Sequence, residues 1–173
     1  MQRNVFLFIL ITVFTFFLMP VCLDATESRN TVNSTDLATL NRLIESRDGP
    51  DLITVMAAWC GPCIEELPIL NRLYVKYRKE GLKLVGIAID LEGPTAMQPI
   101  VDRLKVQFPI YWVGEKAVTA YNIDRLPMLL VVEDGRIIEK IPGKRSKKFL
   151  EEKILELCEP QKQSGCRGTR IIF

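Results

Sequence analysis

Residues 52–63 read Leu-Ile-Thr-Val-Met-Ala-Ala-Trp-Cys-Gly-Pro-Cys, an apolar run that leads directly into two cysteines separated by Gly-Pro. Before the tryptophan the run is apolar except for Thr54, which is typical of a buried strand. The residues after Pro62 follow the periodicity of an amphipathic helix. The two thiols therefore lie at a strand-to-helix turn, where a Cys-x-x-Cys pair can open and close a disulfide reversibly.

The composition of the chain restricts its chemistry. Its 173 residues are 48% hydrophobic and 25% charged, which fits one globular domain with an apolar extension. The formal net charge is +2 and the basic residues are dispersed apart from a cluster at 144–148, expected to be a solvated helix start, so no nucleic-acid partner is expected. The sequence has no histidine, which excludes a histidine general base, a Cys-His pair and the commonest zinc sites. Thiols, carboxylates, lysine or tyrosine must carry the chemistry, and no cofactor or metal is expected.

The N-terminus has the pattern of an export segment. Arg3 precedes residues 5–21, which carry no charge and come close to the roughly 18 to 20 residues that span a bilayer. Residues 1–25 are therefore predicted to be a signal peptide or an N-terminal membrane anchor, which places the domain in the periplasm or cell envelope. Cleavage after export, retention as an anchor and lipidation of Cys22 are alternatives that the pattern leaves open.

The cysteine count is consistent with export. Without Cys22, the chain keeps the pair Cys60 and Cys63 and a second pair, Cys158 and Cys166, near the C-terminus. An exported domain with an even number of cysteines can oxidise both pairs. The second pair is predicted to be a structural disulfide, and two unrelated thiols are the alternative.

Strand and helix patterns alternate along the rest of the chain, after a polar linker at 26–33. Helices are expected at 34–46, 62–79, 95–104, 117–121 and 147–157, and strands at 52–57, 82–89, 109–113, 128–132 and 136–141. The last two strands flank Glu133-Asp134-Gly135, a hairpin signal. We therefore expect an α/β domain over 34–157, with a central mixed β-sheet and helices on both faces, and a C-terminal tail at 158–173.

The cysteine motif and a Leu126-Pro127 pair before the hairpin make residues 34–157 resemble the thioredoxin superfamily. Within it the chain is similar to exported TlpA/ResA-type thiol-disulfide oxidoreductases. Their pattern Trp-Cys-x-Pro-Cys-x-x-Glu-x-Pro is met by Trp59, Cys60, Pro62, Cys63, Glu66 and Pro68. The resemblance implies a thioredoxin-like three-layer fold and a cis peptide at Leu126-Pro127 that faces the cysteines. The client-binding residues that it implies are Trp59, Gly61, Pro62, Leu126 and Pro127.

Three residues depart from the family pattern. Thr54 stands six residues before the first cysteine, where thioredoxins usually carry a buried acid that accepts a proton from the second thiol. Arg125 stands two residues before the expected cis-proline, where glycine is frequent, and would put a cation near the substrate groove. Met56 stands where tryptophan or phenylalanine is common.

The predicted reaction is disulfide exchange. Cys60 is expected to be exposed at a helix N-terminus, which favours its thiolate and makes it the attacking nucleophile, while Cys63 is the resolving thiol. Glu66, three residues further along the same helix face, could exchange a proton with Cys63 if it turns inward. The alternative is an exposed carboxylate that merely interacts with the helix dipole, which is the interpretation that suits Glu65 better.

The Gly-Pro spacer is that of thioredoxin, whose potential is about −270 mV against about −120 mV for the oxidant DsbA, so a reductant is favoured. In an oxidising compartment such a protein needs electrons from a membrane reductase. Its partners would be disulfide-containing client proteins. Apocytochrome c is the client that the resemblance suggests, and general maintenance of the redox state of the envelope fits equally well.

Three other classes of function remain as alternatives. A zinc knuckle would need Cys158 and Cys166 as its second ligand pair, and their spacing fits poorly. A binding or chaperone module could use the same fold with a purely structural disulfide. A redoxin-type peroxidase normally has a Pro-x-x-x-Thr-x-x-Cys setting, which residues 56–63 do not supply.

Overall fold

The structure is a computed structural model that describes residues 30–164, with side chains described as far as Cys158. The predicted export segment at 1–25 and Cys166 lie outside the described residues. None of the helices within 30–164 is long and apolar enough to cross a membrane.

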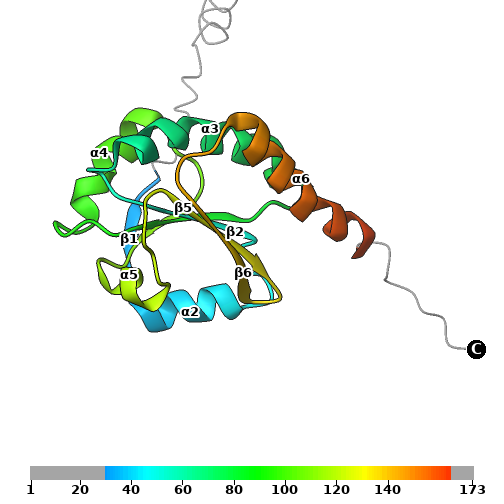
Figure 1. Cartoon of the computed structure of the whole chain (residues 1–173), viewed down its shortest axis with the longest axis horizontal. Coiled ribbons are helices and arrows are strands. Elements are labelled where there is room, and N and C mark those ends of the chain that lie inside the picture. Colours follow the sequence, from blue (N-terminus) through cyan, green and yellow to red (C-terminus); the bar gives the residue numbers. More distant parts are fainter. Residues whose placement is uncertain (1–29, 165–173) are drawn as a thin grey trace, which may run out of the picture.

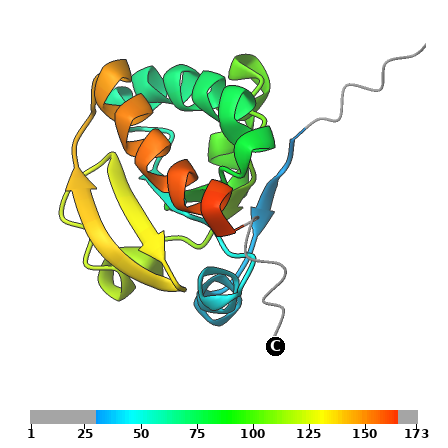
Figure 2. The same ribbon diagram turned by 90° about the vertical axis from the view of Figure 1, so that its right-hand side faces the viewer.

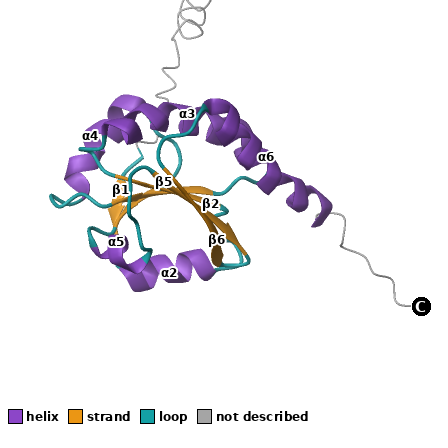
Figure 3. Ribbon diagram, viewed as in Figure 1, coloured by secondary structure: helices purple, strands orange, loops and turns teal. Residues whose placement is uncertain are grey.

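A six-stranded mixed sheet forms the middle layer of the domain (Figure 3). Its strands run in the order β1-β4-β3-β2-β5-β6, with the first four parallel and the last two antiparallel to their neighbours. The strands are β1 Val32–Ser34, β2 Leu52–Met56, β3 Leu84–Ala88, β4 Ile110–Trp112, β5 Met128–Glu133 and β6 Arg136–Pro142.

Helices cover both faces of the sheet, as Figures 1 and 2 show. Helices α3, α4 and α6 lie on one face, and α2 and α5 lie on the other. Their bounds are α2 Leu37–Glu45, α3 Gly61–Tyr77, α4 Pro94–Leu104, α5 Lys116–Ala120 and α6 Lys147–Ser164, with a 3-10 turn at Arg78–Glu80. This three-layer arrangement confirms the predicted fold class.

The centre of the sheet forms the core. Every residue of β2 and β3 is buried, because helices pack on both faces of these strands. Glycine at position 86 of β3 allows unusually close packing, since a Cβ atom there would lie 2.7 Å from Met56 Cε and 3.0 Å from Ile110 Cγ1. The sequences of these two strands are therefore almost entirely apolar because both of their faces are buried.

The N-terminal part of the domain differs from the sequence-based expectation. Residues 32–34, assigned to the end of the linker and the start of a helix, form the edge strand β1 and pair with β4. The helix begins later, and its cap is Asp36 rather than Ser34, because Asp36 Oδ1 accepts a hydrogen bond from Thr39 N at 2.7 Å. Asn30 fastens the entry to β1 by donating to the carbonyl of Phe108 at 2.7 Å. Long-range pairing here prevails over local helical periodicity.

The C-terminal helix also differs, because α6 continues to Ser164 rather than ending at residue 157. The hairpin agrees with its prediction. Asp134 and Gly135 both have positive φ angles, 49° and 73°, which an Asp-Gly turn between two antiparallel strands accommodates.

Candidate active site

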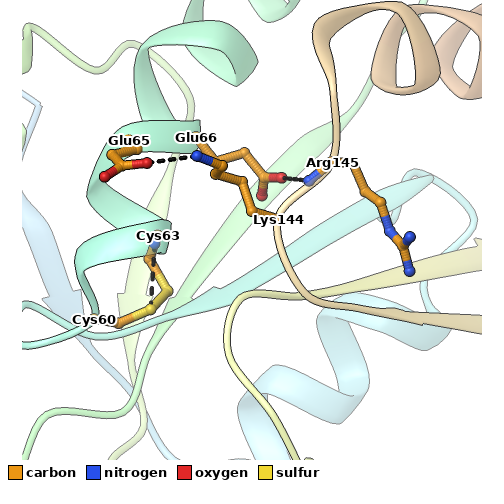
Figure 4. A network of polar contacts seen from close by, with 6 residues as sticks. All are labelled: Cys60, Cys63, Glu65, Glu66, Lys144 and Arg145. Carbon is orange, nitrogen blue, oxygen red and sulfur yellow. Dashed lines mark hydrogen bonds and ion pairs between the residues drawn. A yellow bond between two sulfur atoms is a disulfide. The ribbon is translucent and has the colours of Figure 1, made fainter.

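The cysteine motif lies where β2 ends and α3 begins. Cys60 and Cys63 form a disulfide, with their Cα atoms 5.3 Å apart. Cys60 is the N-cap of α3, and its Sγ accepts a hydrogen bond from Cys63 N at 3.2 Å. The turn itself closes when Cys60 N donates to the carbonyl of Ala57 at 3.1 Å. The structure thus brings the two predicted redox residues together at the predicted strand-to-helix turn (Figure 4).

The exposure of the first thiol differs from the prediction. Cys60 is only 5% exposed, and its sulfur is bonded to that of Cys63 and accepts the hydrogen bond from Cys63 N. The neighbouring Trp59 is 67% exposed, and Gly61 and Pro62 are exposed as well. A partner would therefore meet the backbone and the indole around the disulfide before it meets the sulfur.

The helix that follows provides an electrostatic environment suited to a thiolate. The 17-residue helix α3 has no acidic residue in its first turn, so the positive end of its dipole at Cys60 is not compensated there. Unpaired N–H groups at such a terminus stabilise negative charge. Reduction of the disulfide would place the Cys60 sulfur at this terminus, where the thiolate is favoured.

Glu66 is turned inward, one helical turn beyond Cys63. Its side chain is buried, and Oε1 accepts a hydrogen bond from Arg145 N at 2.6 Å. No described residue donates a hydrogen bond to Oε2. Burial raises the pKa of Glu66, and the N–H and positive charge of Arg145 and the charge of Lys144 oppose this rise only partly. Arg145, the donor to Oε1, lies in the loop before α6. Figure 4 shows the Glu66 carboxylate pointing toward this loop.

Glu65 and the basic cluster also meet at this place. Glu65 is exposed, as expected, and it forms an ion pair with Lys144. Arg145 donates from its guanidinium to the carbonyl of Pro142 at 2.7 Å. The first half of the basic cluster is therefore not simply a solvated helix start, because the Lys144 side chain pairs with Glu65 and the Arg145 backbone N–H donates to Glu66. Only Lys147 and Lys148 belong to the first turn of α6.

The peptide bond between Leu126 and Pro127 is cis, as the resemblance implied. Sheet register explains its place. Val55 lies opposite Met128 in an antiparallel pair, so Pro127, which precedes Met128, lies at the end of the sheet where β2 leads into the cysteine turn. The Pro127 carbonyl accepts a hydrogen bond from Gly143 N at 2.7 Å. Leu126 is half-buried and Arg125 is exposed. The expected client-binding residues thus lie at one end of the sheet.

Two acidic side chains are buried among residues 30–158, Glu66 and Asp90. Thr54 is buried too, at the position where an acid would be expected. Asp90, which sequence analysis did not select, follows β3, and its Oδ1 accepts a hydrogen bond from Ala58 N at 2.7 Å. An acid directly after a buried parallel strand could have been noticed, because residues at the carboxyl ends of such strands gather at one edge of the sheet.

The second cysteine pair is described only in part. Cys158 is buried on α6, and Cys166 lies outside the described residues, so their pairing stays a prediction. Within the part of the chain that the structure describes, no group of three or more His, Cys, Asp or Glu side chains is arranged to hold a metal ion.

Comparisons with known proteins agree with this geometry. Residues 18–156 match the family described as redoxin. The thiol-disulfide oxidoreductase ResA of a Bacillus cereus strain is 35% identical over 95 residues, which cover 54% of each chain. ResA of Geobacillus kaustophilus is 28% identical over 122 residues and 69% of each chain. The chain thus spans about half the length of the first of these relatives.

A solved structure shares the fold. The crystal structure of a putative thiol:disulfide interchange protein DsbE from Chlorobium tepidum superposes with a TM-score of 0.57 at 22% identity. The match covers 62% of this chain and 78% of that one. At 22% identity this match shows that the two proteins share a fold.

Proposed function

The chain belongs to the redoxin family, and on that premise we propose that it is a thiol-disulfide oxidoreductase that reduces disulfides in client proteins. One observation carries this proposal: the Cys60–Cys63 disulfide caps the N-terminus of α3 at the end of the sheet that also holds the cis Leu126-Pro127 peptide. The names of the ResA relatives support the same chemistry.

The proposed reaction has two exchange steps. The Cys60 thiolate attacks one sulfur of a client disulfide, forms a mixed disulfide and releases the other client sulfur as a thiolate, which takes up a proton. Deprotonated Cys63 then attacks the Cys60 sulfur, expels the second client thiolate and closes the Cys60–Cys63 bond. Two electrons pass from the protein dithiol to the client, so a reductant must restore the dithiol after each turnover.

Glu66 is proposed to accept the proton of Cys63 before the second step. It lies one turn further along α3, and Thr54 leaves no acid at the usual position on β2. A carboxyl whose pKa is raised by burial can exchange a proton with a thiol more readily than an exposed one. We assign Glu65 no part in this transfer, because it is exposed and ion-paired.

The client is proposed to bind across the exposed rim of the disulfide. Trp59, Gly61 and Pro62 provide exposed surface on the helix side, and half-buried Leu126 and the buried cis-proline Pro127 lie on the strand side. Exposed Arg125 adds a positive charge beside the strand side of the rim. Apolar client segments with an acidic neighbour would match this surface.

The predicted N-terminal export segment suggests where the reaction takes place. We propose that the domain works in the periplasm or cell envelope, secreted or anchored by residues 1–25. Electrons would come from a membrane reductase, because this compartment is oxidising. Cytochrome c maturation and general redox homeostasis of the envelope are the two roles that such a reductant could serve.

A redox titration of the wild-type protein tests the proposed function. The protein, equilibrated with defined ratios of reduced and oxidised glutathione, should show a potential close to thioredoxin's, about −270 mV, rather than the oxidant's, about −120 mV. It should also speed the reduction of insulin disulfides by dithiothreitol. A chain that binds proteins but shows neither property would be a binding module with a structural disulfide.

Glu66→Gln is expected to slow the second exchange step on the order of a hundredfold. The amide can still accept the hydrogen bond from Arg145 N but cannot take up a proton. Wild-type activity should rise with pH through the elevated pKa of Glu66, and the variant should lose this part of the profile. Single-turnover kinetics across the acid and neutral range measure both effects.

The same variant has a predicted effect on stability. Because the pKa of Glu66 is higher in the folded state than in the unfolded state, the wild-type free energy of unfolding falls as pH rises through that interval. The Gln variant should lose the part of this fall that comes from Glu66 in urea titrations, while Asp90, whose pKa burial also raises, contributes equally in both proteins. Glu65→Gln is the matched control and should keep the wild-type profile; an unchanged profile in Glu66→Gln would contradict the proposed role.

A further inference from the structure

Asp90 is a buried acid beside the cysteine turn for which the two-step reaction has no use. Its side chain is fully buried, at 0% exposure. It lies on the chain just beyond β3, whereas the cysteine turn lies just beyond β2, and these two strands are parallel neighbours. The role inferred for it rests on the proposed exchange reaction.

Three hydrogen bonds fix this region, two of them to the end of β2 and the cysteine turn and one to β4. Asp90 Oδ1 accepts from Ala58 N at 2.7 Å, and Ile89 N donates to the carbonyl of Met56 at 3.1 Å. On the opposite side, Trp112 Nε1 donates to the Asp90 carbonyl at 2.6 Å. Strand β4 thus holds the Asp90 backbone, and the Asp90 side chain holds the turn.

The second carboxylate oxygen has no hydrogen-bond donor among the described residues. Asp90 Oδ2 is buried as well. Burial raises the pKa of Asp90, the N–H of Ala58 and the N–H of Asp90 itself lower it, and the negative charge of exposed Glu92 raises it further. Trp112, on β4, carries no charge. Within the turn, the titratable residue closest in sequence to Ala58 is Cys60, once the disulfide is reduced.

We propose that Asp90 is a positioning residue for disulfide exchange: its carboxylate holds the N–H of Ala58, fixes the turn that presents Cys60, and loosens this turn when it is protonated. A hydrogen bond to an ionised acceptor is roughly twice as strong as one between neutral groups. Ala58 lies within the turn that Cys60 N closes on Ala57. Weakening its anchor therefore affects the placement of the attacking sulfur.

The consequence is a second pH dependence, distinct from formation of the thiolate. The exchange rate per thiolate should be highest above the pKa of Asp90 and should fall as pH drops through it. Glu66 also titrates at the site, but it acts on Cys63 in the second step. The first step, followed as formation of the mixed disulfide with Cys63 replaced by serine, isolates the effect of Asp90.

Three variants in the Cys63→Ser background test the inference. The rate of mixed-disulfide formation with a disulfide peptide is divided by the thiolate fraction, which ultraviolet absorbance measures. Asp90→Asn keeps an acceptor for Ala58 N but does not titrate, so its rate per thiolate should be independent of pH and about three- to tenfold below the parent's plateau. Asp90→Ala removes the acceptor and should be slower still.

Glu92→Gln is the matched control on the same loop. Its plateau rate should equal the parent's, and its inflection should move to lower pH, because a charge that raises the Asp90 pKa is gone. A parent-like pH profile in Asp90→Asn would overturn the proposal. A second pair of results would also overturn it: a rate per thiolate that does not change with pH in the parent, together with a shifted thiolate titration in Asp90→Asn. The carboxylate would then act on the thiol through its charge alone.

A measurement on the oxidised wild-type chain separates this inference from the proposed function. Amide hydrogen exchange at Ala58, corrected for its intrinsic pH dependence, should lose protection as pH falls and should be faster in the single variant Asp90→Ala. Constant protection would overturn the positioning role even in an active enzyme. Lost protection in a protein without exchange activity would instead refute the proposed function and leave the Asp90 contact established.

Discussion

Cys60→Ser is expected to reduce catalysed disulfide reduction to the background rate, a loss on the order of a thousandfold or more. Serine keeps the size of the side chain at the start of α3, but its hydroxyl does not ionise near neutral pH and cannot form the mixed disulfide. Reduction of insulin by dithiothreitol, with and without the protein, measures the effect. The variant also cannot form the Cys60–Cys63 disulfide, so the redox transition of this pair should be missing from a glutathione titration.

The double variant Cys158→Ala/Cys166→Ala is the matched control, because it removes the other predicted cysteine pair without leaving one thiol unpaired. This variant should retain the wild-type rate. Full activity of Cys60→Ser would show that exchange does not begin at this thiol and would refute the proposed function. Retained binding of a protein partner by an inactive Cys60→Ser variant would show that recognition is independent of the nucleophile.

The central elements of the fold could be predicted because local and long-range requirements agree there. Residues 52–56 and 84–88 are apolar, and double-sided burial demands that composition. The hairpin at 128–142 has the turn residues that its positive φ angles require. The place of the cysteine motif could be predicted as well, because it depends only on the junction between one strand and one helix.

The first strand could not be predicted, because its stability depends on residues far away in the sequence. Val32 lies opposite Ile110 in the sheet, and Val32 N donates to the side chain of Gln98 at 2.8 Å. The local pattern of residues 30–34 does not predict these partners. The helical periodicity that follows therefore extends the predicted helix too far toward the N-terminus.

The same limit applies to the buried acids. The sequence places Glu66 on the face of Cys63, but its hydrogen-bond donor is Arg145, 79 residues away. Asp90 meets Ala58 only because β2 and β3 are adjacent. The spacing of a motif identifies residues that share an element, whereas the protonation of these carboxyls depends on loops that the fold brings to them.

Cys63→Ser is expected to stop the reaction after its first step and to accumulate a covalent adduct with the client. Cys60 can still attack, but the serine oxygen cannot displace the client sulfur from Cys60. In the wild-type structure the two Cα atoms are 5.3 Å apart, close enough for Cys63 to resolve such an adduct. Turnover should therefore fall to background, and intact mass measurement should show the chain plus one client molecule.

In cells, adducts of the Cys63→Ser chain would identify both the clients and the reductase that supplies electrons. They should disappear on treatment with dithiothreitol, because only a disulfide holds them. The double variant Cys60→Ser/Cys63→Ser is the control and should capture nothing covalently. Adducts that persist in the double variant would place the reactive thiol elsewhere, and rapid turnover by Cys63→Ser alone would show that an external thiol resolves the mixed disulfide. Only if resolution is internal does the proton acceptor role of Glu66 follow, since that role acts on the Cys63 thiol.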